Sequence, residues 1–69
     1  MERYYVNQNT DTNPKNDHEV HKESCRLLPL RDKIDLGYHN NCQSALGKAS
    51  QYYYNVDGCR VCIPECHRG

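Results

Sequence analysis

Cysteine and histidine most constrain how this chain can fold, because the rest of the sequence offers little to hold a structure together. The chain has 69 residues, of which 36% are hydrophobic, and it contains no phenylalanine or tryptophan. A domain of about this size buries only about 60% of the surface that its unfolded chain exposes, so its core is marginal. The five cysteines and four histidines are therefore the groups from which we expect a stabilising cross-link.

Charge and hydropathy argue against two classes of partner. Nine basic and nine acidic side chains leave a formal net charge of zero, so no basic stripe is available to neutralise nucleic-acid phosphates. No window approaches the roughly 18 apolar residues that a membrane span needs. We expect a monomer that binds neither nucleic acid nor membrane and whose partner, if it has one, is a protein that the sequence does not identify.

The cysteines also bear on the compartment. The N-terminal segment MERYYVNQNT has no apolar core of the kind found in signal peptides. A thiol-rich chain without an export signal is expected in the reducing cytoplasm, where clustered cysteines bind metal more often than they pair. The odd number of cysteines agrees with this prediction, since a complete set of disulfides would leave one over.

The N-terminal part predicts a β-hairpin with a long loop. Residues 3–7, RYYVN, form an aromatic and β-branched run typical of a strand. Residues 18–25, HEVHKESC, are the candidate returning strand. Between them, residues 7–17 are rich in Asn and Asp, which favour turns, and predict a flexible loop.

The middle of the chain predicts one main helix. Pro29 can open a single helical turn over residues 30–35, which Gly37 would end. Asn41 is a suitable N-cap for a longer helix that continues into the tyrosines at 52–54. Its apolar face follows helical spacing and contains Cys42, Ala45, Leu46, Ala49 and Tyr53.

Two pairs of metal-ligand residues lie at opposite ends of this helical region. Cys59 and Cys62 form a C-x2-C pair in DGCRVCIP, and His21 and Cys25 form an H-x3-C pair in HKESC. Structural zinc sites are tetrahedral and commonly take Cys and His ligands as two close pairs. The sequence therefore predicts one zinc ion held by these four residues. The predicted fold class is a small zinc-stabilised α+β domain over residues 1–69, with a β-hairpin, one main α-helix and a C-terminal C-x2-C knuckle.

The same residues resemble a known family. The pattern H-x3-C … LGYHNNCQSALGKA … DGCRVCIP over residues 21–64 is similar to the zinc-binding domain of the Ada DNA-repair protein. The resemblance includes the inner-face Ala45 and Pro64 after the second cysteine pair. It implies a zinc site and, in the family, methyl transfer to the first cysteine of the quartet. That position is His21 here, so only the zinc site is carried over.

A second resemblance covers nearly the whole chain. Small bacterial proteins share DHEVH, LP, LGY, DGC and ECH at these spacings. This resemblance implies no particular activity.

Several residues compete for the fourth ligand position or have other roles. Cys42, Cys66, His67 and His18 are the rivals of His21. Cys42 is interpreted as a buried core thiol, with pairing to Cys66 as an alternative that could depend on redox conditions. The segment ECH at residues 65–67 is interpreted as a frayed tail beside the site, with a second ligand set as the alternative.

Enzymatic interpretations find weaker support. HEVH at residues 18–21 is one residue short of the H-E-x-x-H metalloprotease motif, and in a strand His18 and His21 diverge. CRVC lacks the βαβ context of a thioredoxin motif, and C-x2-C-x3-C matches no common iron–sulfur spacing. We therefore expect a non-enzymatic interaction module with a structural zinc ion. The alternatives are a degenerate Ada-like nucleic-acid-binding domain and a disulfide-stapled domain without metal.

Overall fold

The chain folds as a small α+β domain. The computed structural model describes residues 1–10 and 16–68. Over these residues a four-stranded mixed sheet is joined by one α-helix and one short 3-10 helix. The elements in chain order are β1 (Glu2–Asn7), β2 (His18–Lys22), β3 (Lys33–His39), α1 (Cys42–Ala49), β4 (Val56–Gly58) and η1 (Pro64–Cys66).

The predicted hairpin is the centre of the sheet, whose strand order is β3-β1-β2-β4. β1 and β2 are antiparallel, with Val6 opposite Val20 and Tyr5 opposite His21. β2 ends at Lys22, three residues earlier than predicted, because the N–H of Cys25 turns back to the Lys22 carbonyl. β4 adds in parallel to β2, a pairing that the sequence did not predict.

The loop predicted over residues 7–17 falls partly on residues 11–15, which lie outside the described residues. Hydrogen bonds hold the described residues that come before and after this segment. The N–H of Gln8 donates to the Asp32 carbonyl at 2.8 Å, and the Thr10 hydroxyl donates to Oδ1 of Asn16 at 2.7 Å. The prediction that the loop is flexible stays a prediction.

The predicted helical turn at residues 30–35 is wrong, because β3 begins at Lys33 and extends to His39. Asp32 adopts a positive φ of 61°, which interrupts any right-handed helical turn. Ile34 then pairs with Val6 of β1. Gly37 does not end a helix; at a φ of 85° it lies inside β3, close to the register shift in the β1–β3 pairing.

The main helix begins as predicted and ends early. Oδ1 of Asn41 accepts the N–H of Ser44 at 2.8 Å, which confirms the N-cap. α1 ends at Ala49 and not among the tyrosines, since the N–H groups of Tyr52 and Tyr53 both return to the Ala49 carbonyl in a turn. The Tyr53 ring then stacks on the His18 ring, with centroids 3.6 Å apart.

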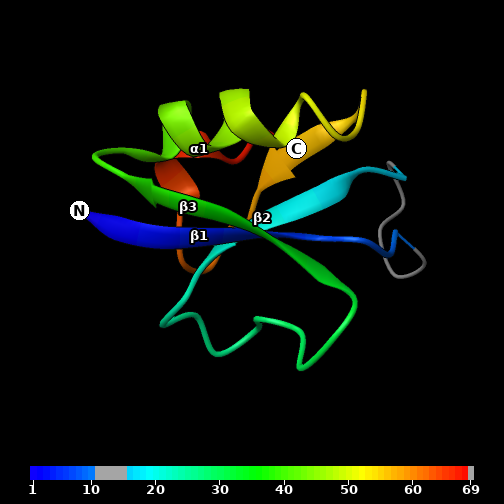
Figure 1. The fold of residues 1–69 in the computed structure, drawn as a ribbon, viewed down its shortest axis with the longest axis horizontal. Helices are drawn as coiled ribbons and strands as arrows, with labels where there is room; N and C mark the ends of the chain where they lie inside the picture. The colour runs from blue at the N-terminus through cyan, green and yellow to red at the C-terminus, as the bar shows by residue number, and fades with distance from the viewer. Residues whose placement is uncertain (11–15, 69) are drawn as a thin grey trace.

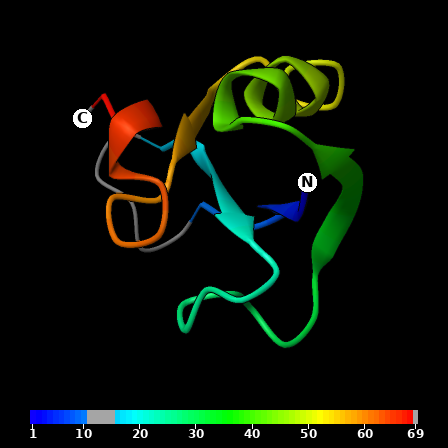
Figure 2. The same ribbon diagram turned by 90° about the vertical axis from the view of Figure 1, so that its left-hand side faces the viewer.

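The core lies between α1 and the sheet. Figures 1 and 2 show α1 over one face of the sheet, while the segment at residues 23–32 passes beyond the other face. Small alanines on α1 let the helix approach the strands closely. Among the described residues, no helix is long and apolar enough to cross a membrane. The buried apolar residues are Tyr4, Val6, Val20, Leu36, Ala45, Ala49 and Ile63, together with four of the cysteines.

Two glycines are expected to respond oppositely to an added methyl group. A Cβ on Gly58 of β4 would lie 3.0 Å from the backbone carbon and oxygen of Cys66, so Gly58→Ala should destabilise the fold by about 1–3 kcal/mol through overpacking. A Cβ on Gly47 would meet nothing within 4 Å, and Gly47→Ala should stabilise α1 by up to about 1 kcal/mol. Urea unfolding of both variants at saturating zinc measures the difference, and equal midpoints would contradict the close packing of β4 on Cys66.

Candidate metal centre

Four residues from distant parts of the chain converge on one point. One potential ligand atom from each of His21, Cys25, Cys59 and Cys62 lies within 4.8 Å of all the others. These are the four residues that the sequence predicts as zinc ligands. The structure therefore brings together a His/Cys3 group that could hold a metal ion.

Backbone hydrogen bonds place the two halves of this cluster. His21 is on β2, and Cys25 lies in the turn that its own N–H closes on the Lys22 carbonyl at 3.0 Å. The N–H of Cys59 donates to the Val20 carbonyl at 2.9 Å, extending the parallel ladder between β2 and β4. The missed strand β4 is thus the element that carries the second pair of ligands to the first.

The C-x2-C segment is a closed turn, and a backbone N–H is directed at the sulfur of its second cysteine. The N–H of Ile63 donates to the Cys59 carbonyl at 2.9 Å, which folds Cys62 back over the cluster. The N–H of Lys22 points at Sγ of Cys62 at 3.5 Å. An N–H directed at sulfur favours the thiolate, which is the form that binds metal.

Two separations in the cluster match those of a tetrahedral zinc site. Zn–S bonds of about 2.3 Å and Zn–N bonds of about 2.0–2.1 Å require S···S and N···S separations of about 3.8 and 3.6 Å. Sγ of Cys25 lies 3.9 Å from Sγ of Cys59 and 3.6 Å from Nδ1 of His21. Hydrogen bonds between thiols, or between a thiol and a histidine, also have lengths of this size. Such bonds join two atoms at a time, however, and do not explain why four ligand atoms lie together.

Burial gives the cluster its electrostatic character. His21, Cys25 and Cys59 are buried, while Cys62 is half-buried. Burial lowers the pKa of His21, which keeps its ring neutral and able to bind metal. Burial, followed by a hydrogen bond with Cys25, raises the pKa of Cys62 to about 12. Without a cation this burial disfavours the thiolate of Cys62, and a bound metal ion would compensate its negative charge.

The ring of His21 has a different neighbour at each nitrogen. Nδ1 faces the cluster through Sγ of Cys25, and Nε2 lies 3.7 Å from Oε1 of Glu19. Sequence reasoning assigned no role to Glu19. The signal was the strand alternation itself, because residues 19 and 21 lie on one face of β2.

The two remaining cysteines form a disulfide, Cys42–Cys66. Cys42 is buried in the core as predicted, but it is not a thiol, because the pairing with Cys66 that the sequence left as an alternative is present. The prediction of a frayed tail at residues 65–67 is wrong. η1 holds Cys66 in place with only 7% of its surface exposed. The disulfide does not replace the metal cluster, because Cys25, Cys59 and Cys62 are free thiols.

The other rival ligands lie outside the cluster. The disulfide occupies Cys42 and Cys66. Nδ1 of His67 donates to the Gly58 carbonyl at 2.9 Å and lies 3.4 Å from Oδ2 of Asp57. Nδ1 of His18 donates to the Asn7 carbonyl at 2.9 Å. His67 thus joins the C-terminal segment to the edge strand β4, and His18 joins the ends of the central strands β1 and β2.

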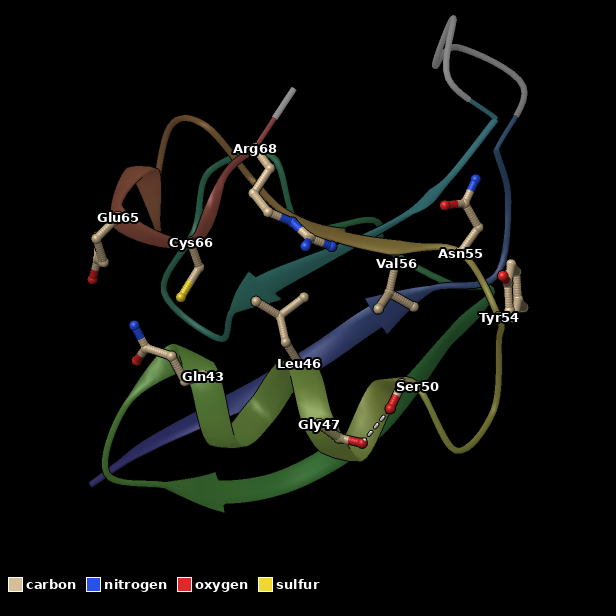
Figure 3. Close-up of a pocket in the computed structure, with 10 residues that line it drawn as sticks. All are labelled: Gln43, Leu46, Gly47, Ser50, Tyr54, Asn55, Val56, Glu65, Cys66 and Arg68. Atoms are coloured by element: carbon tan, nitrogen blue, oxygen red, sulfur yellow. Dashed lines mark hydrogen bonds between the residues drawn. The ribbon is translucent and has the colours of Figure 1, made fainter.

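A surface groove of about 490 Å³ lies between α1, β4 and the C-terminal segment. Figure 3 shows Leu46 of α1 and Val56 of β4 pointing toward each other across it, with Arg68 and Glu65 on the C-terminal side. None of the four cluster residues lines this groove. The metal cluster and the groove are therefore separate features.

Comparison with protein-family models, curated proteins and solved structures finds no match for this chain. The resemblance to the Ada zinc-binding domain stays a prediction. The chemistry of the site rests on the geometry of its own residues.

Proposed function

We propose that this chain is a small zinc protein in which His21, Cys25, Cys59 and Cys62 bind one structural zinc ion. In this proposal the ion holds together a non-enzymatic interaction module. The elements follow one another along the chain as hairpin, helix and C-terminal knuckle. One ligand pair therefore precedes α1 in the sequence, and the other follows it.

The observation that carries the proposal is the convergence of four ligand atoms within 4.8 Å. Three sulfurs and one imidazole are a common donor set of structural zinc sites. Soft thiolates favour zinc, copper(I) and iron–sulfur chemistry over magnesium or calcium. The mixed Cys3His set favours zinc among these.

A structural role is favoured over a catalytic one because four protein ligands fill a tetrahedral zinc ion. Catalytic zinc sites keep one position for water or substrate and take three ligands from the protein. With His21 included, the cluster supplies all four positions. The ion is therefore proposed to stabilise the fold of a monomeric interaction module.

The resemblance to Ada enters this proposal only through the zinc site. The zero net charge argues against the nucleic-acid-binding alternative. A filter-binding titration over salt concentration tests that alternative, since phosphate contacts require affinity to fall as salt rises.

Cobalt(II) substitution tests the proposed ligand set. We expect one bound cobalt ion, d–d bands of a tetrahedral site, and charge-transfer intensity from three thiolates. Cys62→Ser should remove the contribution of one thiolate, because it deletes one sulfur of the cluster.

The matched control for this experiment is Cys42→Ser, which changes a cysteine outside the cluster. It should leave the cobalt spectrum unchanged. A four-thiolate spectrum, or a chain that is folded and binds no metal in native mass spectrometry, would refute the proposed site.

Zinc affinity is expected to rise with pH. An ordinary cysteine thiol has a pKa of about 8.5, and burial raises the pKa of Cys62 to about 12 in the folded chain without metal. Below about pH 8.5, zinc must therefore displace a proton from this thiol whether the metal-free chain is folded or unfolded. The pKa of His21 is lowered, so its ring is already neutral at pH 7. The apparent binding constant should therefore increase at least tenfold per pH unit from about pH 6.5 to 8.5, one factor of ten per proton released. Competition with a chromophoric chelator measures this slope, and a flat profile would contradict thiolate ligation.

A further inference from the structure

The carboxylate of Glu19 lies beside the nitrogen of His21 that faces away from the cluster. Glu19 and His21 are two residues apart on β2, so their side chains leave the strand on the same face. Nδ1 of His21 is 3.6 Å from Sγ of Cys25, and Nε2 is 3.7 Å from Oε1 of Glu19. The ring therefore bridges the sulfur cluster and the carboxylate.

A metal-bound imidazole needs a hydrogen-bond acceptor at its second nitrogen. A neutral histidine carries one proton, so a ring that binds metal through Nδ1 must hold its proton on Nε2. The His21 side chain is only 3% exposed, and a buried N–H without an acceptor is unfavourable. Metal-bound histidines in proteins usually donate this second N–H to a carboxylate, a carbonyl or water, which fixes the ring and strengthens the ligand.

We propose that Glu19 is the positioning residue of the metal site: it accepts the Nε2–H of His21 and so selects Nδ1 as the zinc ligand. The inference rests on the proposed zinc site and adds a residue outside the four ligands. The separation of 3.7 Å exceeds a hydrogen bond of about 2.7–3.2 Å. The proposal therefore requires the side chain of Glu19, which is 35% exposed, to rotate toward the ring.

Charged groups from several segments of the chain surround Glu19. The charged groups near it are Asp17 ahead of β2, Asp57 of β4, Arg60 of the knuckle and His67 of the C-terminal segment. Arg60 lies between the ligands Cys59 and Cys62. Arg60 and the two aspartates carry opposite charges, so their electrostatic effects on the Glu19 carboxylate oppose one another.

Zinc affinity and the state of the His21 ring test the inference together. Glu19→Ala should weaken zinc binding by about 10–100-fold in chelator competition, with one zinc still bound at saturation. Glu19→Gln should lie between Glu19→Ala and the wild type, because its amide oxygen accepts a hydrogen bond without carrying charge. It also serves if the alanine variant folds poorly. In ¹⁵N spectra of the zinc-loaded protein, the His21 Nε2–H should shift and exchange faster in both variants.

The matched control is Glu23→Ala, which removes the same charge two residues after His21. Glu23 lies near Arg3, with 3.6 Å between their charged atoms, so this variant should keep wild-type affinity and the wild-type His21 signal. Unchanged affinity and Nε2–H in Glu19→Ala would overturn the role of Glu19 and leave the zinc site standing. A wild-type spectrum with the proton on Nδ1 would do the same. A wild-type protein that takes up no zinc would overturn both proposals.

Discussion

Removal of zinc by a chelator is expected to unfold this chain at neutral pH, even with the Cys42–Cys66 disulfide intact. Structural zinc contributes an apparent binding free energy of about 10–16 kcal/mol in small domains. This is comparable with the whole stability of a typical small protein, about 5–15 kcal/mol. Among residues 1–10 and 16–68, the largest fully buried side chains are Ile63, Val6, Val20 and Cys59, and one of these is a proposed ligand. We expect circular dichroism and amide proton NMR to report loss of the sheet and of dispersed signals.

Two further measurements separate zinc binding from other effects of the chelator. Adding zinc back in excess should restore the spectrum, whereas magnesium should not, because magnesium prefers oxygen ligands. Cys59→Ser in the presence of zinc should resemble the chelated wild type, since it removes the ligand that joins β4 to the cluster. A chelated chain that keeps its NMR dispersion and a cooperative unfolding transition would show that the core suffices without metal.

The parts of the fold that local sequence determines were predictable. The aromatic and β-branched run of β1 and the Asn41 cap of α1 act over a few residues, and both are present in the structure. β3 was missed because its conformation depends on pairing with β1, about thirty residues earlier in the chain. Pro29 and Gly37 suggested a helical turn locally, and the long-range strand pairing overrode that preference.

The same division applies to the candidate site. Each pair of proposed ligands is close in sequence, so spacing alone indicated both pairs. Their meeting depends on the parallel pairing of β2 with β4, three residues long and bounded by Gly58, which carries almost no sequence signal. The contacts around the ligands, from Glu19 and from the N–H of Lys22, depend on the orientation of single groups on β2 and could not be read from spacing.

The cysteine count was informative and was interpreted too narrowly. Five thiols suggested metal binding because a complete set of disulfides leaves one over. The structure divides them into one disulfide and three free thiols beside a histidine. The pair depends on tertiary packing, since Cys42 begins α1 and Cys66 ends η1, with Cα atoms 6.3 Å apart.

Loss of the disulfide is expected to destabilise the zinc-loaded fold by about 3–4 kcal/mol. The bridge closes a loop of 24 residues in sequence separation, and the chain-entropy model gives a stabilisation of this size for such a loop. The bridge also joins α1 to η1 across the edge of the core, because both cysteines are buried. Urea unfolding of Cys42→Ala/Cys66→Ala against the wild type, both at saturating zinc, measures the loss.

Thiol counting and zinc stoichiometry make this result specific to the bridge. The unfolded, metal-free wild type should react with an alkylating reagent at three cysteines before reduction and at five after it, because only Cys42 and Cys66 are paired. The double variant should still bind one zinc ion, since its four proposed ligands are intact. Equal stability of the two proteins would show that the bridge adds nothing to the zinc-loaded fold. Loss of zinc from the double variant would instead place Cys42 or Cys66 among the ligands and refute the division of the five cysteines into a bridge and a metal site.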